Sequence, residues 1–157
     1  MNAEAVNVGH DGSMAPSASM IRVREIDHIV LRVVDVDAML AFYCGMLGMA
    51  VERRVDALGL VQLRAGRSLI DLVPIDGELG RAGGAAPGDE GRNLDHFCLR
   101  VEPFDERAIR QQLRAAGIEA GETKSRYGAE GEGPSIYVND PEGNVVELKG
   151  PPSEEER

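Results

Sequence analysis

The chain has 157 residues, 43% of them hydrophobic, which is enough to bury a core of its own. Its 27 acidic and 17 basic residues give a formal net charge of -10, and this acidity argues against nucleic acid or an anionic membrane as the partner. A small soluble ligand is the better expectation. The two cysteines, Cys44 and Cys98, offer no disulfide framework, which favours a reducing compartment and hence the cytoplasm.

The two ends of the chain differ from its middle in composition. Residues 1–20 are rich in small and polar side chains and lack the continuous apolar run of a signal peptide, so we expect a disordered leader there. No segment approaches the roughly 20 apolar residues of a membrane span. Residues 151–157 are expected to form a frayed tail.

A short internal repeat is the most informative feature of the sequence. The pattern D-H-x-x-L-R-V occurs at residues 27–33 and again at 95–101, so that His96 repeats His28. Both copies alternate as β-strands do. A helical pattern follows each copy: Asp35 or Asp37 can cap the first helix, and Gly48 can end it. Asp105 and Gly117 have the same positions in the second half.

Shorter alternating runs follow each predicted helix. They span 51–55, 58–64 and 68–73 in the first half, and a turn at 140–143 joins 135–138 to 145–148 in the second. Each half therefore predicts a strand, a helix and three more strands, which is an α+β fold made of two modules. We place module one at 21–75, a glycine-rich linker at 76–92 and module two at 93–150.

The alternation of side chains along the predicted strands indicates a metal site. His28 and His96 point away from the apolar positions of their strands, and Asp71 and Glu147 interrupt the apolar last strand of each half on the same side. A carboxylate on an apolar strand is costly to desolvate unless a cation compensates it. Two imidazoles and one or two carboxylates suit one divalent ion, such as Ni, Zn, Mn or Fe.

Two further motifs give the chain a family resemblance. Residues 42–49 read F-Y-C-G-M-L-G-M, and residues 137–147 read Y-V-N-D-P-E-G-N-V-V-E. With the repeat, they make residues 21–150 resemble the vicinal oxygen chelate superfamily of glyoxalases, bleomycin-resistance proteins and extradiol dioxygenases. The resemblance implies two βαβββ modules whose mixed sheet curls into a cup, with ligands on the first and last strand of each module.

The resemblance also assigns roles to residues. His28, His96 and Glu147 occupy three ligand positions, and Asp71 stands where glyoxalase I enzymes usually carry Glu. We expect residues 126–133 to form a mobile loop at the mouth of the cup. This loop and the alternation of side chains along the strands predict six substrate-binding residues: Arg32, Arg100, Gln62, Ser135, Tyr137 and Arg126. Members of the family commonly form homodimers, and the sequence leaves open whether the site lies within one chain or between two.

The leading functional expectation is a divalent-metal-dependent lyase or isomerase of the glyoxalase type, acting on a small carbonyl-containing metabolite. The metal would polarise the carbonyl while Glu147, with Asp71 as its partner, moves the adjacent proton. One alternative is a non-haem iron dioxygenase of the extradiol type that uses His28, His96 and Glu147 alone. Another is a resistance protein that binds a drug without metal or chemistry.

Overall fold

The computed structural model describes residues 26–152, so the expected leader at 1–20 and residues 153–157 of the expected tail lie outside the described residues. The elements in chain order are β1 (His28–Val33), α1 (Val36–Leu40), which continues as a π-helical stretch (Ala41–Met46), β2 (Ala50–Val55), a 3-10 turn (Asp56–Leu58), β3 (Leu60–Ala65), β4 (Ser68–Pro74), α2 (Glu78–Arg81), β5 (His96–Arg100), α3 (Glu106–Ala115), β6 (Lys124–Gly128), β7 (Gly131–Asn139) and β8 (Val145–Lys149).

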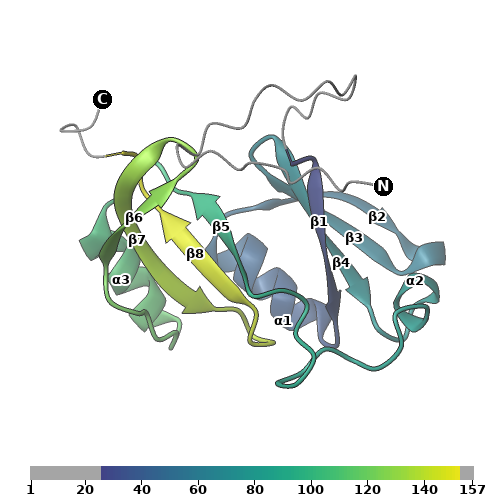
Figure 1. Ribbon diagram of the computed structural model, residues 1–157. Coiled ribbons are helices and arrows are strands. Elements are labelled where there is room, and N and C mark those ends of the chain that lie inside the picture. Colours follow the sequence, from purple (N-terminus) through teal and green to yellow (C-terminus); the bar gives the residue numbers. More distant parts are fainter. Residues whose placement is uncertain (1–25, 153–157) are drawn as a thin grey trace, which may run out of the picture.

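The strands form two sheets of four with the same internal order. One sheet runs β1-β4-β3-β2 and the other β5-β8-β7-β6 (Figure 1). In each, the first strand pairs in parallel with the last, and the other pairs are antiparallel. This confirms the predicted α+β fold of two βαβββ modules. Among the described residues, no helix is both long and apolar enough to cross a membrane.

The helix boundaries follow the predicted signals. The Asp35 carboxylate accepts from the backbone N–H of Ala38 at the start of α1, and Gly48 has a φ of 73° where the helical segment has ended. Asp105 caps α3 in the same way. Gly117 follows α3 with a φ of 70°, a left-handed conformation that glycine adopts without a Cβ clash. The two modules therefore begin and end their main helices by the same chemistry.

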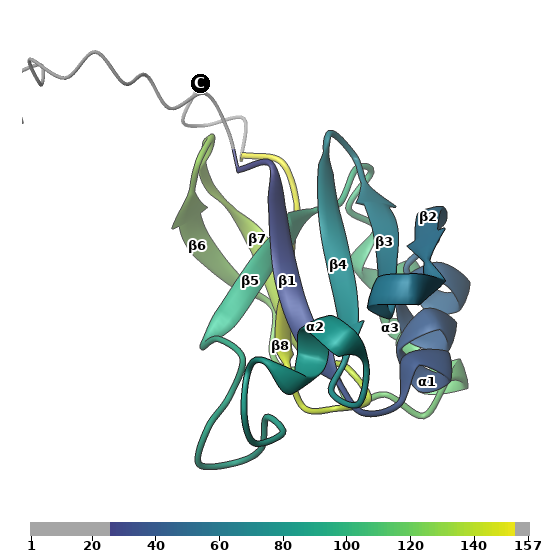
Figure 2. The same ribbon diagram turned by 90° about the vertical axis from the view of Figure 1, so that its right-hand side faces the viewer.

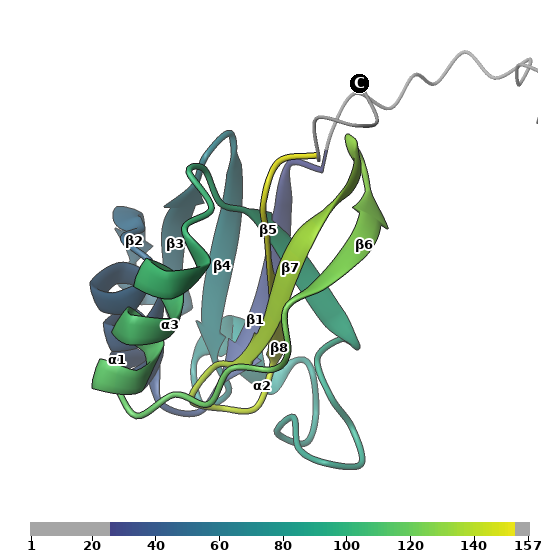
Figure 3. The same cartoon turned by 90° about the vertical axis from the view of Figure 1, so that its left-hand side faces the viewer.

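The apolar core lies on the helix side of both sheets. The strand positions that alternate away from the histidines, such as Leu31, Ile70 and Leu148, are at most 3% exposed and belong to one cluster that includes buried side chains of both modules. Helices α1 and α3 lie next to each other on this side (Figure 3), and the Gln112 side chain donates to the Met46 carbonyl oxygen between them. Burial of this face leaves the opposite face of each sheet for polar side chains.

Polar contacts fasten the two modules to each other. The Tyr43 hydroxyl of module one donates to the Asp140 carboxylate of module two at 2.8 Å, and both side chains are buried. The Glu142 carboxylate accepts from the backbone N–H groups of Val34 and Asp35 at the start of α1. These contacts come from the 140–144 turn, which therefore connects modules as well as strands.

One expectation about an irregular segment was wrong. Residues 126–133, expected to be a mobile loop, form most of the β6–β7 hairpin, whose register pairs Arg126 with Gly133 and Gly128 with Gly131. Gly133 is buried with the Pro151 carbonyl oxygen 2.5 Å from where a Cβ would stand, so glycine here permits close packing rather than motion. The linker also contains the short helix α2, which packs with Gly80 buried.

Candidate functional site

The first module places His28 and Asp71 on the sheet face away from the helices. Asp71 is 6% exposed, and both of its carboxylate oxygens accept from the Gln62 side-chain amide, at 3.0 and 3.1 Å. The pKa of His28 is raised, first by its hydrogen bond to Asp27 and then by the negative charge of Asp71. His28 and Asp71 therefore interact electrostatically.

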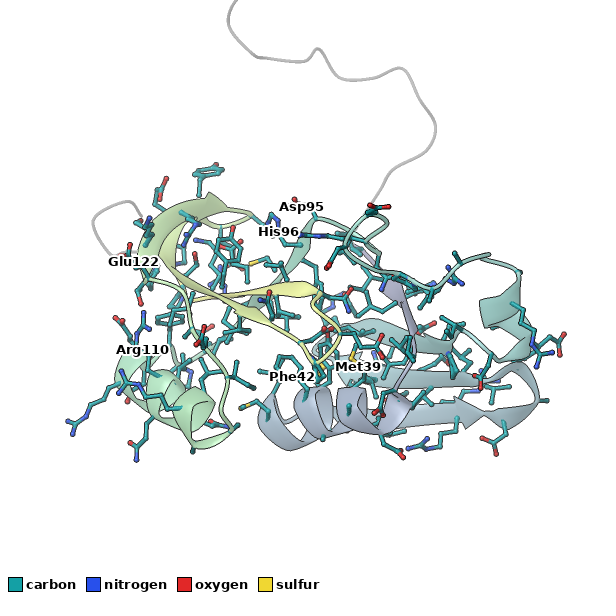
Figure 4. The ribbon with its side chains drawn as sticks, turned by 90° about the horizontal axis from the view of Figure 1, so that it is seen from below. Met39, Phe42, Asp95, His96, Arg110 and Glu122 are labelled. Atoms are coloured by element: carbon teal, nitrogen blue, oxygen red, sulfur yellow. The ribbon has the colours of Figure 1, made fainter. Side chains whose placement is uncertain are left out.

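The second module repeats this arrangement with a closer contact. His96 Nε2 lies 3.7 Å from Glu147 Oε2, and the Tyr137 hydroxyl donates to the same carboxylate oxygen at 3.3 Å. Glu147 is 6% exposed. Figure 4 shows His96 on the side of the sheet away from the helices that carry Met39 and Arg110.

An aspartate directly before each histidine holds its imidazole. His28 Nδ1 lies 2.8 Å from Asp27 Oδ1, and His96 Nδ1 lies 2.6 Å from Asp95 Oδ2. A carboxylate on one ring nitrogen fixes the tautomer in which Nδ1 carries the proton, and this leaves Nε2 with a lone pair. Metal-binding histidines in proteins show this second contact almost always.

One chain does not bring the two pairs together. Strands β1 and β5 lie side by side at the centre of the molecule but incline to each other, and they belong to separate sheets (Figures 1 and 2). Within residues 26–152, no three side chains of His, Cys, Asp or Glu gather closely enough to hold a metal ion. Each module therefore offers one imidazole and one carboxylate, which is half of a four-ligand set.

Arg32 does not line the face as expected. Its guanidinium donates to four carbonyl oxygens of the linker, those of Gly80, Gly83, Gly84 and Ala85, at 2.8 to 3.0 Å. Its Nε is buried without a hydrogen-bond partner. Because four of its five N–H groups are used in this way and the fifth is enclosed, Arg32 holds the linker against β1, and we remove it from the set of substrate-binding residues.

The other predicted binding residues lie on the second module, apart from Gln62. The Arg126 guanidinium stands over the Tyr137 ring, 4.5 Å from its centre, and donates to the backbone and side-chain oxygens of Ser135. Arg100 forms an ion pair with Glu130 at the tip of the β6–β7 hairpin, with 2.5 Å between nitrogen and oxygen. The structure thus brings Arg126, Ser135 and Tyr137 together, whereas Arg100 is paired with an exposed acid.

Sequence reasoning missed Lys149. It follows Glu147 by two residues on β8, so alternation alone assigns it to the same face. The residue is only 4% exposed, and its ammonium donates to the carbonyl oxygens of Arg126 and Gly133. A terminal position on the strand made a solvent-exposed lysine the ordinary expectation, and only the packing of the β6–β7 hairpin overrides it.

Comparison with known proteins shows the family of the chain. The model of the "Glyoxalase/Bleomycin resistance protein/Dioxygenase superfamily" matches residues 25–148. The virulence protein STM3117 of Salmonella typhimurium is 27% identical over 132 residues, covering 80% of this chain and 83% of that protein. Its crystal structure matches with a TM-score of 0.68 at 26% identity, covering 83% of this chain and 99% of that one.

Two further solved structures share the fold. The lactoylglutathione lyase of Agrobacterium tumefaciens has a TM-score of 0.60 at 24% identity and covers 82% of this chain and 95% of its own. The fosfomycin resistance protein FosX of Listeria monocytogenes has a TM-score of 0.62 at 19% identity, covering 82% and 92%. The family match over residues 25–148 shows that the chain belongs to the glyoxalase, bleomycin-resistance and dioxygenase superfamily, and the repeated βαβββ architecture agrees with it.

Proposed function

We propose that the protein is a divalent-metal-dependent lyase or isomerase that acts on a small carbonyl-containing metabolite. His28 and Asp71 of one copy, with His96 and Glu147 of a second copy, would hold the metal. The observation that carries this proposal is the repeated Asp–His contact beside a buried acid. Each module thereby offers an imidazole nitrogen and a carboxylate oxygen as metal ligands, and these donor types fit Ni, Zn, Mn or Fe.

A second copy is needed because contacts within one chain hold its two modules in an arrangement that keeps the two His–acid pairs apart. Asn93, just before β5, donates to the carbonyl oxygen of Arg32 near the end of β1, while His28 lies at the start of that strand. The Tyr43–Asp140 contact fastens the same pair of modules. Pairing module one of each copy with module two of the other brings both halves of the ligand set together without breaking these contacts.

The chemistry assigns separate tasks to the side chains around Glu147. A bound divalent metal would polarise the substrate carbonyl and so acidify the proton on the neighbouring carbon. Glu147, an acid largely shielded from water, would take that proton and return it one atom away, a transfer that needs no further reactant. The pKa of Tyr137 is raised by burial and by Glu147, so Tyr137 keeps its proton and can donate to this carboxylate throughout.

Metal analysis tests the proposal. Protein purified without added metal should contain about one Ni, Zn, Mn or Fe per chain. The Glu147→Gln and His96→Ala variants should lose it while keeping the fold. Asp95→Asn should weaken affinity by about 10- to 100-fold, because only the orienting carboxylate is lost. Glu119→Gln, an exposed acid on the loop after α3, is the matched control.

Activity then separates the classes of function. The proposal predicts isomerase or lyase turnover with hemithioacetals or related carbonyl compounds, and its loss in Glu147→Gln. Iron bound by the protein together with cleavage of a catechol ring would instead identify a dioxygenase. A metal-free protein that binds a drug tightly and turns over no carbonyl substrate would contradict the enzymatic account.

A further inference from the structure

The sheet register places one hydrogen-bond donor directly across from each acid of the proposed site. Gln62 stands opposite Asp71 in the β3–β4 pair, and Tyr137 stands opposite Glu147 in the β7–β8 pair. Directly opposed residues of neighbouring strands have their side chains on the same face of the sheet. The third strand of each module therefore supplies a side chain that contacts the acid on the fourth, and the two modules use different donors for this contact.

Gln62 contacts both carboxylate oxygens of Asp71. Its Nε2 lies 3.0 Å from Oδ1 and 3.1 Å from Oδ2, so the nitrogen stands almost evenly between the two oxygens. Only this orientation of the amide is attractive, because the amide oxygen would face the carboxylate as a second acceptor. The donor is neutral, so the carboxylate keeps its negative charge for a cation. Asp71 is also 6% exposed, which leaves little room for water at the same oxygens.

The other strand next to Asp71 offers it no donor. Its partner in the parallel β1–β4 register is Val30, an aliphatic side chain that is 50% exposed. Of the two side chains directly opposite Asp71 on its neighbouring strands, Gln62 is thus the one that can form a hydrogen bond. The position of the carboxylate therefore depends on Gln62.

Glu147 is held less tightly than Asp71. The Tyr137 hydroxyl donates to Oε2 at 3.3 Å, and His96 Nε2 lies 3.7 Å from the same oxygen. A glutamate side chain also has one more rotatable bond than an aspartate side chain. Under the proposed function Glu147 carries a proton from one substrate atom to the next, which requires a carboxylate that can shift. The two acids are thus held in ways that suit a stationary ligand and a moving base.

We propose that Gln62 is a positioning residue that holds Asp71 in place as a stationary metal ligand. The Gln62 amide takes the space between the two carboxylate oxygens, which a metal bound through both of them would need. Asp71 then has one oxygen to present to a cation, and Glu147 is left as the acid that moves. This inference rests on the proposed function and deepens it, since it gives Gln62 a task other than binding substrate.

Selective ¹⁵N labelling of glutamine tests the contact in metal-free, full-length protein. The chain has three glutamines, Gln62, Gln111 and Gln112, so the spectrum contains three pairs of side-chain amide signals. The Gln62 protons should exchange with water more slowly than those of the exposed Gln111, and Asp71→Ala should remove this protection. They should stay protected when Zn²⁺ is added. Gln62 protons that exchange as fast as those of Gln111 would overturn the inference.

Zn²⁺ affinity tests the consequence of the contact. Gln62→Met removes the amide but keeps a side chain of similar length, and Zn²⁺ binding, measured by competition with a chelator, should weaken about 10- to 100-fold. Gln111→Met, which alters an exposed glutamine of α3, is the matched control and should leave the affinity as it is.

A double-mutant cycle shows whether Gln62 acts through Asp71. Asp71→Ala keeps three of the four proposed ligands and should bind Zn²⁺ more weakly than wild type. In that background Gln62→Met should change the affinity by less than about twofold, because the carboxylate that Gln62 holds is already absent. A fall of equal size in both backgrounds would assign Gln62 a general structural role and overturn the inference. Should Asp71→Ala take up no Zn²⁺, the comparison of Gln62→Met with Gln111→Met carries the test.

The two proposals fail in different ways. Wild-type protein that takes up no Zn²⁺, although the Gln62 protons are protected, contradicts the proposed function. Normal Zn²⁺ uptake that Gln62→Met leaves unchanged contradicts the inference alone. Weaker Zn²⁺ binding in Gln62→Met that depends on the presence of Asp71 supports both.

Discussion

At the scale of single residues, alternation along the strands directs the Cβ atoms of His28, His96, Asp71 and Glu147 to the sheet face away from the helices. A long side chain can still travel several ångströms from there. Arg32 turns into the linker, and Lys149 turns under the β6–β7 hairpin. Neither contact leaves a signal in the local sequence, since each depends on a segment more than 15 residues away.

Cys98 provides a test of the electrostatics around Glu147. Burial raises the pKa of this thiol to about 11, with a further contribution from the Glu147 charge, against the lowering effects of Lys149 and Arg100. At pH 8 the thiol should therefore react slowly with a disulfide reagent, and its rate should rise as the pH approaches 11, because only the thiolate attacks. Metal-free protein with Cys44→Ser isolates the signal.

The Glu147→Gln variant distinguishes the charge from burial. Removing the negative charge should lower the pKa of Cys98 and speed its reaction at pH 8, although burial, the larger cause, keeps the pKa above the ordinary value. Glu119→Gln should leave the rate as it is. Equal Cys98 reaction rates in Glu147→Gln and wild-type protein would show that Glu147 and the thiol are not arranged as described.

At the scale of elements, the 140–144 turn connects the two modules as well as the two strands that its sequence predicts it to join. The sequence predicts a type I turn, and the backbone N–H of Gly143 indeed donates to the Asp140 carbonyl oxygen at 3.0 Å. The Asp140 carboxylate also accepts from Glu142, Asn144 and, across the module boundary, Tyr43. A motif that reads as a strand connection thus sets the relation between the modules.

The Tyr43→Phe variant tests this role. It removes one hydrogen bond to a buried carboxylate, so we expect the free energy of unfolding to fall by about 1–3 kcal/mol. Chemical denaturation measures the change. Tyr127→Phe, which alters a tyrosine that is 80% exposed, should change stability by less than about 0.5 kcal/mol. Equal stability of Tyr43→Phe and wild type would show that the contact contributes nothing to holding the modules together.

The β6–β7 hairpin shows why part of the fold was not predictable. Glycines at 128, 131 and 133 read as a flexible loop, yet Gly128 and Gly133 permit close contacts with Lys149 and Pro151, and Gly131 provides the φ of 114° at the start of β7. Composition reports the conformational freedom of glycine but not whether another chain segment approaches it. Strands β1 and β5, by contrast, could be predicted because the same pattern occurs twice and each copy carries its own apolar face.

At the scale of the whole molecule, the repeat predicts two like modules but not their mutual placement. The described chain keeps its two His–acid pairs apart and fastens the modules in that relation through Tyr43, Asp140 and Glu142. The proposed metal site, which draws on both modules, then requires a dimer in which module one of each copy faces module two of the other. Closed dimers with twofold symmetry are the commonest oligomers, and this one would contain two equivalent sites.

Complementation between two defective copies tests this account most directly. Asp71→Ala/His28→Ala and His96→Ala/Glu147→Ala chains, each alone, should bind no metal. Co-expressed with different affinity tags and purified as the mixed dimer, they should bind about one metal per dimer, because one of the two sites then receives both intact halves. A mixed dimer as empty of metal as its parents would contradict a site shared between copies.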